Sequence, residues 1–157
     1  MSDANELISF IASMSGEGNL RVEENLGEGY VRLRVSEAER RQAKHDIQHV
    51  EDIVIEMLRN ARDAGADKVY LATTKEDGVR TLVFLDNGSG VPQDMQERIF
   101  DARVTSKLES MKMDRWGVHG RGMALFSIKQ NTDEARVVSS GVDLGSAFKA
   151  VSYTHLR

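Results

Sequence analysis

Three polar residues on one predicted helix are the first candidates for chemistry. Glu56, Asn60 and Asp63 lie in the stretch EMLRNARDAGA at positions i, i+4 and i+7. At about 100° per residue these positions fall on one face of a helix. The face adjoins an apolar stripe with helical spacing that includes Ile53 and Met57. Taken alone the segment favours a solvated helix edge, so its role depends on motifs further along the chain.

The stretch DNGSG places an aspartate at the end of an apolar segment. Asp86 is followed by Gly88 and Gly90, and glycine permits a positive φ and lets a flat ligand approach the backbone closely. An ionised aspartate at the bottom of such a pocket can accept a hydrogen bond from an exocyclic amine. An ordinary turn would have the same composition, so this motif leaves both interpretations open.

A second glycine-rich stretch, GVHGRG, precedes a predicted helix. Its glycines are Gly117, Gly120 and Gly122, and backbone N–H groups at a helix N-terminus are suited to binding phosphate. No Gly-Lys-Ser/Thr follows, and no strand leads directly into it, so it is neither a Walker A loop nor a dinucleotide fingerprint. Residues 98–122 contain six Lys or Arg and three Asp or Glu. This locally basic region therefore surrounds the candidate phosphate loop.

The elements that must position these motifs alternate between helices and strands. We expect a short helix over residues 4–14, a β-hairpin over residues 20–35, and a long helix from the Ser36–Glu39 capping box to Ala64, with a break possible near residues 44–47. Two strands, a short helix over residues 93–100, a helix containing Leu125 and Ile128, and two final strands follow. This order predicts an α+β fold, a two-layer sandwich of a mixed sheet with helices on one face.

Length and composition fit one soluble domain. The chain has 157 residues, 40% apolar and 29% charged, and a net charge of −4. The acidic balance argues against nucleic-acid binding by this domain alone, and no segment has the length and composition of a membrane span. There is no cysteine, which excludes disulfides and thiolate metal sites. We therefore expect a cytoplasmic protein.

The three motifs, in this order, resemble the Bergerat-fold ATPases of the GHKL superfamily, which contains gyrase, heat-shock chaperone, histidine kinase and MutL. EMLRNARDA resembles the N box, DNGSG the G1 box and GVHGRGMAL the G2 box. ERIFDARVTSK resembles the F box of histidine kinases and the matching lid of MutL, and GSAF resembles the final strand motif. Ala124 departs from the pattern, since another glycine is usual there. The resemblance covers residues 36–151, preceded by an N-terminal helix and hairpin over residues 1–35.

This resemblance implies ATP and Mg²⁺ as cofactors and a role for each matching residue. Glu56 would orient or deprotonate the attacking water, and Asn60 would coordinate the Mg²⁺ that bridges the phosphates. Asp63 would orient Asn60 or bond elsewhere in the helix. Asp86 would read the adenine amino group. The remaining ATP-binding positions would shape the adenine pocket or contact phosphates, and they are Gly88, Gly90, Lys107, Gly117, Gly120, Arg121 and Gly122.

Three functions remain open. The first is an ATP-hydrolysing conformational switch of the MutL or chaperone type, favoured by Glu56. The alternative is the catalytic domain of a histidine or serine kinase that phosphorylates a separate partner. A third is an ATP sensor without turnover. His45 and Asp46 invite comparison with a phosphoacceptor pair, but they lie on the same helix system as Asn60, so a solvated helix surface is the better interpretation.

The two ends of the chain suggest partners. The final stretch VSYTHLR resembles a translated sequencing adapter, which would make residues 152–157 an artefactual tail, so we expect the natural chain to extend beyond residue 151 into an effector domain. Alternatively, the partner of this domain is a separate, unidentified protein. The N-terminal hairpin could support a homodimer, although packing over a sheet edge is the simpler expectation.

Overall fold

Four antiparallel strands form the main sheet of the computed structural model, which describes residues 22–105, 113–114, 117–118 and 123–153. The strands are β3 (Val69–Glu76), β4 (Val79–Asp86), β8 (Glu134–Ser140) and β9 (Ser146–Tyr153), in the order β3-β4-β9-β8. Every neighbouring pair is antiparallel, so the expectation of a mixed sheet was wrong. Two hairpins supply the sheet, and a hairpin always joins antiparallel strands.

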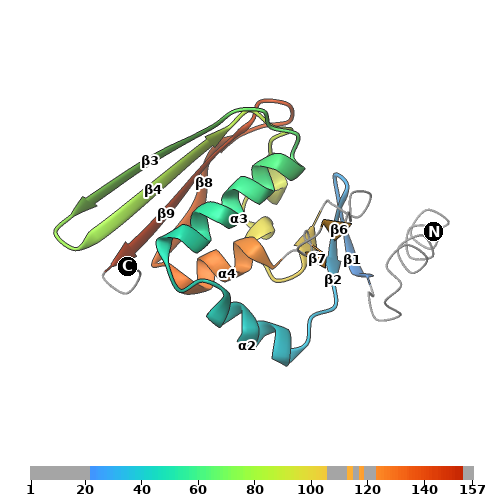
Figure 1. Ribbon diagram of the computed structural model, residues 1–157. Helices are drawn as coiled ribbons and strands as arrows, with labels where there is room; N and C mark the ends of the chain where they lie inside the picture. Colours follow the sequence, from blue (N-terminus) through green and yellow to red (C-terminus); the bar gives the residue numbers. More distant parts are fainter. Residues whose placement is uncertain (1–21, 106–112, 115–116, 119–122, 154–157) are drawn as a thin grey trace.

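Two helices, α3 (Val50–Asp63) and α4 (Ala124–Asn131), lie over one face of this sheet, which makes the expected two-layer α+β arrangement (Figure 1). A third helix, α2 (Glu37–Asp46), packs against α4. Alternate side chains of β4 and β9 point towards the helices, and Phe84 and Phe148 are buried there against Ile53, Met57 and Ile128. Burial of each such side chain stabilises the fold by about 1.5–3 kcal/mol.

The expected long helix is divided into two. Helix α2 begins at the predicted capping box, in which Ser36 N–H donates to Glu39 at 2.8 Å and Glu39 N–H donates to Ser36 Oγ at 3.2 Å. It ends at Asp46, because Ile47 has an extended backbone and is buried in the core. The break therefore occurs at residues 47–49, at the end of the region in which the sequence allowed one.

Helix α3 begins with its own acidic anchor. The Asp52 carboxylate accepts hydrogen bonds from the N–H groups of Gln48 at 2.9 Å and His49 at 2.8 Å. These two backbone bonds hold the pKa of Asp52 below its ordinary value. A negative charge in the first turn also suits the helix dipole, so the start of the helix that contains Glu56 is fixed locally.

The short helix expected over residues 93–100 is replaced by two 3₁₀ turns. These are η1 (Gln93–Met95) and η2 (Arg98–Phe100). Met95, Ile99 and Phe100 are buried, so the segment follows the core closely with single turns rather than one regular α-helix.

A smaller sheet joins the N-terminal hairpin to the segment after η2. Strands β1 (Val22–Gly27) and β2 (Tyr30–Leu33) form the predicted hairpin, and β2 pairs with β5 (Val104–Thr105). The hairpin therefore extends β5 and does not cover an edge of the main sheet. A two-residue pair, β6 (Met113–Asp114) with β7 (Gly117–Val118), completes the described strands. The helix expected over residues 4–14 lies outside the described residues.

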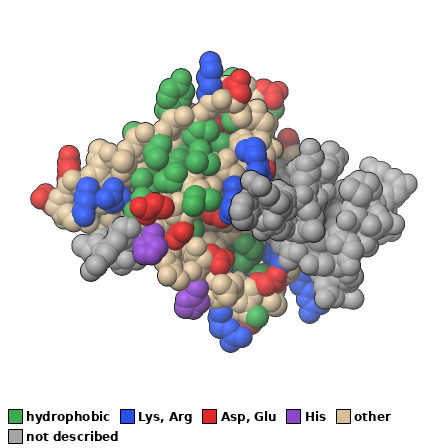
Figure 2. Space-filling view, in the orientation of Figure 1, with side chains coloured by type: hydrophobic (Ala, Val, Ile, Leu, Met, Phe, Trp, Pro, Cys, Tyr) green, Lys and Arg blue, Asp and Glu red, His purple; other side chains and the backbone are tan. Residues whose placement is uncertain are grey.

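Hydrophobic side chains gather on the face where α3 lies along the sheet (Figure 2). The exposed large residues of α3 are Ile55 and Leu58, and Leu71 on the edge strand β3 is also exposed. Within the described ranges, no helix combines the length and the apolar character that a membrane crossing requires. At the C-terminal side, strand β9 continues to Tyr153, with Val151 and Ser152 buried.

Candidate functional site

A cavity of about 780 Å³ lies among helices α2, α3 and α4 and the loop after β4. Five of the residues singled out from the sequence line it together: Glu56, Asn60, Asp63, Asp86 and Gly90. Apolar side chains form much of the remaining wall, among them Ile47, Met57, Val91, Ile99, Val104, Leu125 and Phe148. Such a cavity, largely apolar with a few convergent polar groups, is typical of a small-molecule site.

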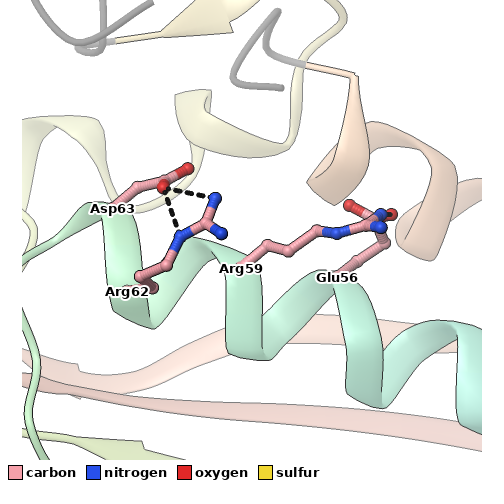
Figure 3. A network of polar contacts seen from close by, with 4 residues as sticks. All are labelled: Glu56, Arg59, Arg62 and Asp63. Atoms are coloured by element: carbon pink, nitrogen blue, oxygen red, sulfur yellow. Dashed lines mark hydrogen bonds and ion pairs between the residues drawn. The ribbon is translucent and has the colours of Figure 1, made fainter. Parts of the chain in front are cut away.

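The polar face of α3 forms one wall of this cavity and is not a solvated edge. Glu56, Arg59 and Asp63 project from α3 on the side away from the strands (Figure 3). Glu56 Oε1 lies 2.6 Å from Arg59 Nη1, and Asp63 Oδ1 accepts from Arg62 at 3.2–3.3 Å. Their side chains are only partly exposed, 27% for Glu56 and 18% for Asp63. Asp63 follows Glu56 by seven positions, so the wall extends about 10 Å along the helix.

The Asp86 side chain lines the cavity. It is the last residue of β4 and is paired across the sheet with Ser146, which is buried. Gly88 N–H donates to Asp86 Oδ1 at 2.9 Å, which fixes the orientation of the carboxylate. In the part of the chain that the structure describes, Oδ2 has no hydrogen-bond partner. This oxygen is therefore available to accept from a ligand.

The glycines of DNGSG also pack closely against the protein's own backbone. A Cβ on Gly88 would lie 2.8 Å from the Ala64 carbonyl oxygen, and a Cβ on Gly90, whose φ is +74°, would lie 1.9 Å from the Gly141 carbonyl oxygen. The positive φ of Gly90 agrees with the prediction. Both glycines, however, allow close packing against the protein's own backbone, and Gly88 does not line the cavity.

Backbone hydrogen bonds join the two loops at this side of the cavity, residues 86–90 and 141–146, which we name the loop end. Gly145 N–H donates to Gly88 O at 3.1 Å and Asp143 N–H donates to Ser89 O at 2.8 Å. Ser89 N–H donates to Ala64 O at 2.9 Å, which ties the loop end to the C-terminus of α3. The position of Asp86 relative to α3 is thus set by main-chain contacts.

The expected phosphate loop is only partly described. Helix α4 begins at Ala124, and Met123 and Ala124 line the cavity. The Met123 side chain makes no capping hydrogen bond at the helix start. Gly117 lies in strand β7. Lys107, Gly120, Arg121 and Gly122 lie outside the described residues, and their predicted roles stay predictions.

Sequence reasoning missed several cavity residues, above all the charged ones. Glu39, Arg59 and Arg103 line the cavity with Glu56, and we name these four residues the charged wall. Arg59 follows Glu56 by three positions, a spacing that predicts an ion pair on a helix. No local pattern indicates that Arg103 is buried. Thr105, Ser127 and Ser146 also line the cavity, whereas His45 and His49 are exposed and do not.

A comparison with protein-family models decides the family. Residues 47–146 match the model of the histidine kinase-, DNA gyrase B- and HSP90-like ATPases. The chain belongs to this family. The two-layer fold is thus the Bergerat fold of the GHKL ATPases, with the N box on α3, the G1 box after β4 and the G2 box before α4.

Individual relatives agree with this placement. The chain is 34% identical over 113 residues to DNA mismatch repair protein MutL of Staphylococcus aureus strain Newman, and 32% identical over 93 residues to MutL of Thermodesulfovibrio yellowstonii. These alignments cover 66% and 58% of this chain but 17% of each MutL, so the chain spans about one sixth of the relatives' length. Among solved structures, full-length ShkA in complex with AMPPNP aligns with a TM-score of 0.51 at 15% identity, over 99% of this chain and 37% of that one.

The donors on the cavity wall suit a magnesium nucleotide. Among the described residues, no group of three or more His, Cys, Asp or Glu side chains could hold a metal by itself. Mg²⁺ is usually held by one or two protein oxygens together with the phosphates of a nucleotide, and the wall offers the Asn60 amide beside Glu56 and Asp63. Two arginines supply positive charge for phosphates, and Asp86 supplies an acceptor for an amine.

Proposed function

We propose that this chain is a Mg²⁺-dependent ATP-binding domain that hydrolyses ATP as a conformational switch. The observation that carries the proposal is that Glu56, Asn60 and Asp86 line a single cavity although Asp86 is far from the other two in sequence. An acceptor for adenine, an amide for Mg²⁺ and a carboxylate for water are the functional groups that ATP hydrolysis in such a site requires.

The base would bind at the loop end. Asp86 Oδ2 accepts a hydrogen bond from the adenine amino group while Gly88 N–H holds Oδ1. A charge-assisted bond of this kind discriminates against a base that presents a carbonyl oxygen at the same position, because two acceptors would then face each other. Gly88 and Gly90 act indirectly, since their packing fixes the loop that contains Asp86.

The phosphates would lie between α3 and the start of α4. Asn60 would hold Mg²⁺ through its amide oxygen, and Asp63 would orient the Asn60 side chain. The Met123 side chain makes no capping hydrogen bond at the N-terminus of α4, and the N–H groups of a helix N-terminus favour an anion. We assign phosphate contacts also to Lys107, Gly117, Gly120, Arg121 and Gly122, on the strength of the G2 and lid motifs.

Glu56 would carry out the chemical step. Its carboxylate accepts a proton from a water molecule as the water oxygen bonds to the γ-phosphorus, and the bond from that phosphorus to the ADP oxygen breaks. The ion pair with Arg59 at 2.6 Å keeps the carboxylate on the cavity wall. Glu56 is therefore the proposed catalytic residue, and Arg59 positions it.

The switch would act on another domain or protein. The alignment covers about one sixth of MutL, which is a much longer protein. We therefore propose that nucleotide binding acts on further domains, on a separate partner or on a second copy of the chain. Phosphotransfer to a partner protein, as in a kinase, is the alternative use of the same site.

The proposal is tested with Glu56→Gln, which removes the base but keeps the shape of the side chain. Phosphate release from ATP should fall about 10²–10⁴-fold, while ATP affinity measured by calorimetry should change by less than about threefold. Release that is unaffected by the substitution would contradict the role of Glu56. Label from γ-³²P-ATP that appears on protein instead of as free phosphate would support the kinase alternative.

A further inference from the structure

Arg103 is a buried arginine in an unusual backbone conformation. It is 4% exposed, and its φ is +63°, in the left-handed region that residues other than glycine rarely adopt. It lies between η2 and β5, and its carbonyl oxygen accepts from Leu33 N–H of strand β2 at 2.8 Å. The surrounding structure therefore holds this residue in place despite the cost of the conformation.

The guanidinium of Arg103 is paired with a carboxylate that has a second task. Glu39 Oε1 forms the ion pair with Arg103 Nη2. Glu39 Oε2 accepts from Ser36 N–H at 2.8 Å and from Ser36 Oγ at 3.1 Å, within the capping box of α2. One carboxylate thus connects a cavity arginine to the start of a helix.

The charges on the cavity wall indicate why Arg103 and Glu39 matter for an anionic ligand. The described part of the wall contains five carboxylates, which are Glu39, Asp46, Glu56, Asp63 and Asp86, and two cations, Arg59 and Arg103. Arg59 is already paired with the proposed catalytic carboxylate. Of these two cations, Arg103 is therefore the one that does not pair with the proposed catalytic carboxylate, and its buried position strengthens its attraction for a polyphosphate that enters this acidic cavity.

We propose that Arg103 binds the polyphosphate of the nucleotide and that Glu39 is its competitor within the protein. The inference rests on the proposed ATP site and adds to it a residue that the sequence motifs do not assign. On binding, the Arg103–carboxylate pair gives way to an Arg103–phosphate pair. Glu39 keeps its bonds to Ser36, so α2 stays capped while its link to the cavity is released.

Two substitutions separate this role from a structural one. Arg103→Met removes the charge but keeps much of the apolar volume, and Glu39→Gln removes the competing charge but keeps an oxygen that can complete the capping box. Calorimetric titrations would compare ATP with adenosine, which has the base but no phosphate. Urea unfolding of each variant would report whether the fold is intact.

We expect Arg103→Met to weaken ATP binding about tenfold or more and to leave adenosine binding unchanged. Glu39→Gln should strengthen ATP binding about threefold to tenfold, again without an effect on adenosine. If Arg103→Met does not fold, Arg103→Lys keeps the charge but loses the planar fork, and it should weaken ATP binding while adenosine binding is retained.

Equal losses for ATP and adenosine in the folded arginine variants would overturn the inference, and so would weaker ATP binding in Glu39→Gln. These results would leave the proposed function intact, because the unsubstituted domain would still bind ATP. If the folded, unsubstituted domain binds neither ATP nor adenosine, the proposed function itself is wrong, and this inference fails with it.

Discussion

The two sides of the cavity are constructed in different ways. At the loop end, main-chain hydrogen bonds and glycine contacts between residues 86–90, residues 141–146 and Ala64 fix the geometry. On the charged wall, the side-chain ion pairs Glu56–Arg59 and Glu39–Arg103 fix it. The loop end depends on close backbone packing, which allows a single arrangement. The charged wall depends on ion pairs, whose charges can exchange partners.

This difference fits the division of labour that we propose. A site that reads a flat, neutral base benefits from a fixed acceptor, whereas a site that binds and hydrolyses a polyphosphate must let charges rearrange. Substitutions of the loop-end glycines, which change the packing of the two loops, should therefore act mainly on stability. Substitutions on the charged wall should act mainly on nucleotide binding and turnover.

The largest stability effect is expected from Gly90→Ala. The new Cβ would lie 1.9 Å from the Gly141 carbonyl oxygen and would need a φ of +74°, so the two loops must separate. We expect a loss of about 2–4 kcal/mol in the free energy of unfolding, measured in urea.

Gly65→Ala is the matched control. Gly65 has nearly the same φ, +75°, but a Cβ there would meet nothing within 4 Å. It should cost only the backbone strain of about 1–2 kcal/mol. Equal losses of unfolding free energy in the two variants would mean that the close contact between the loops does not contribute to stability. The proposed difference between the loop end and the charged wall would then be wrong.

A smaller effect is expected at the start of α3, the helix that contributes Glu56 and Arg59 to the charged wall. Asp52→Ala removes the acceptor for Gln48 N–H and His49 N–H and should cost about 1 kcal/mol of unfolding free energy near neutral pH. Because the pKa of Asp52 is lower in the folded protein than its ordinary value, the stabilisation is fully present above the ordinary value and is lost as the pH falls through the folded pKa.

The difference in unfolding free energy between the unsubstituted protein and Asp52→Ala should therefore be constant above about pH 5 and should narrow as the pH falls further in urea titrations. A difference in unfolding free energy that stays constant or widens in acid would show that the Asp52 carboxylate does not stabilise the start of the helix in its charged form.

The smallest effect is expected from Arg62→Ala. Arg62 forms an ion pair with Asp63 at 3.2 Å, but its side chain is 58% exposed, compared with 31% for Arg59. Exposed pairs contribute little, so the unfolding free energy should change by less than about 0.5 kcal/mol. A loss of more than about 1 kcal/mol in the free energy of unfolding, measured in urea, would show that an exposed ion pair outside the charged wall contributes substantially to stability.

Local patterns in the sequence were sufficient to predict the hairpins, the Ser36–Glu39 capping box and the polar face of α3, because each depends on residues close together in the chain. They did not predict the sheet order. They allowed a break near residues 44–47 but did not decide it, because the burial of Ile47 in the core determines the backbone path there. The burial of Arg103 and the contacts that require Gly88 and Gly90 involve segments far apart in sequence. Such features become visible only in the folded chain.

The central claim is that one cavity binds Mg·ATP through Asp86 and Asn60, and calorimetric titration of the purified domain tests it directly. The account predicts saturable binding of Mg·ATP that falls about tenfold or more in both Asp86→Asn and Asn60→Ala, with urea unfolding curves close to that of the unsubstituted domain. An unsubstituted, folded domain that binds no nucleotide would contradict the account, and so would one whose affinity is unchanged by both substitutions.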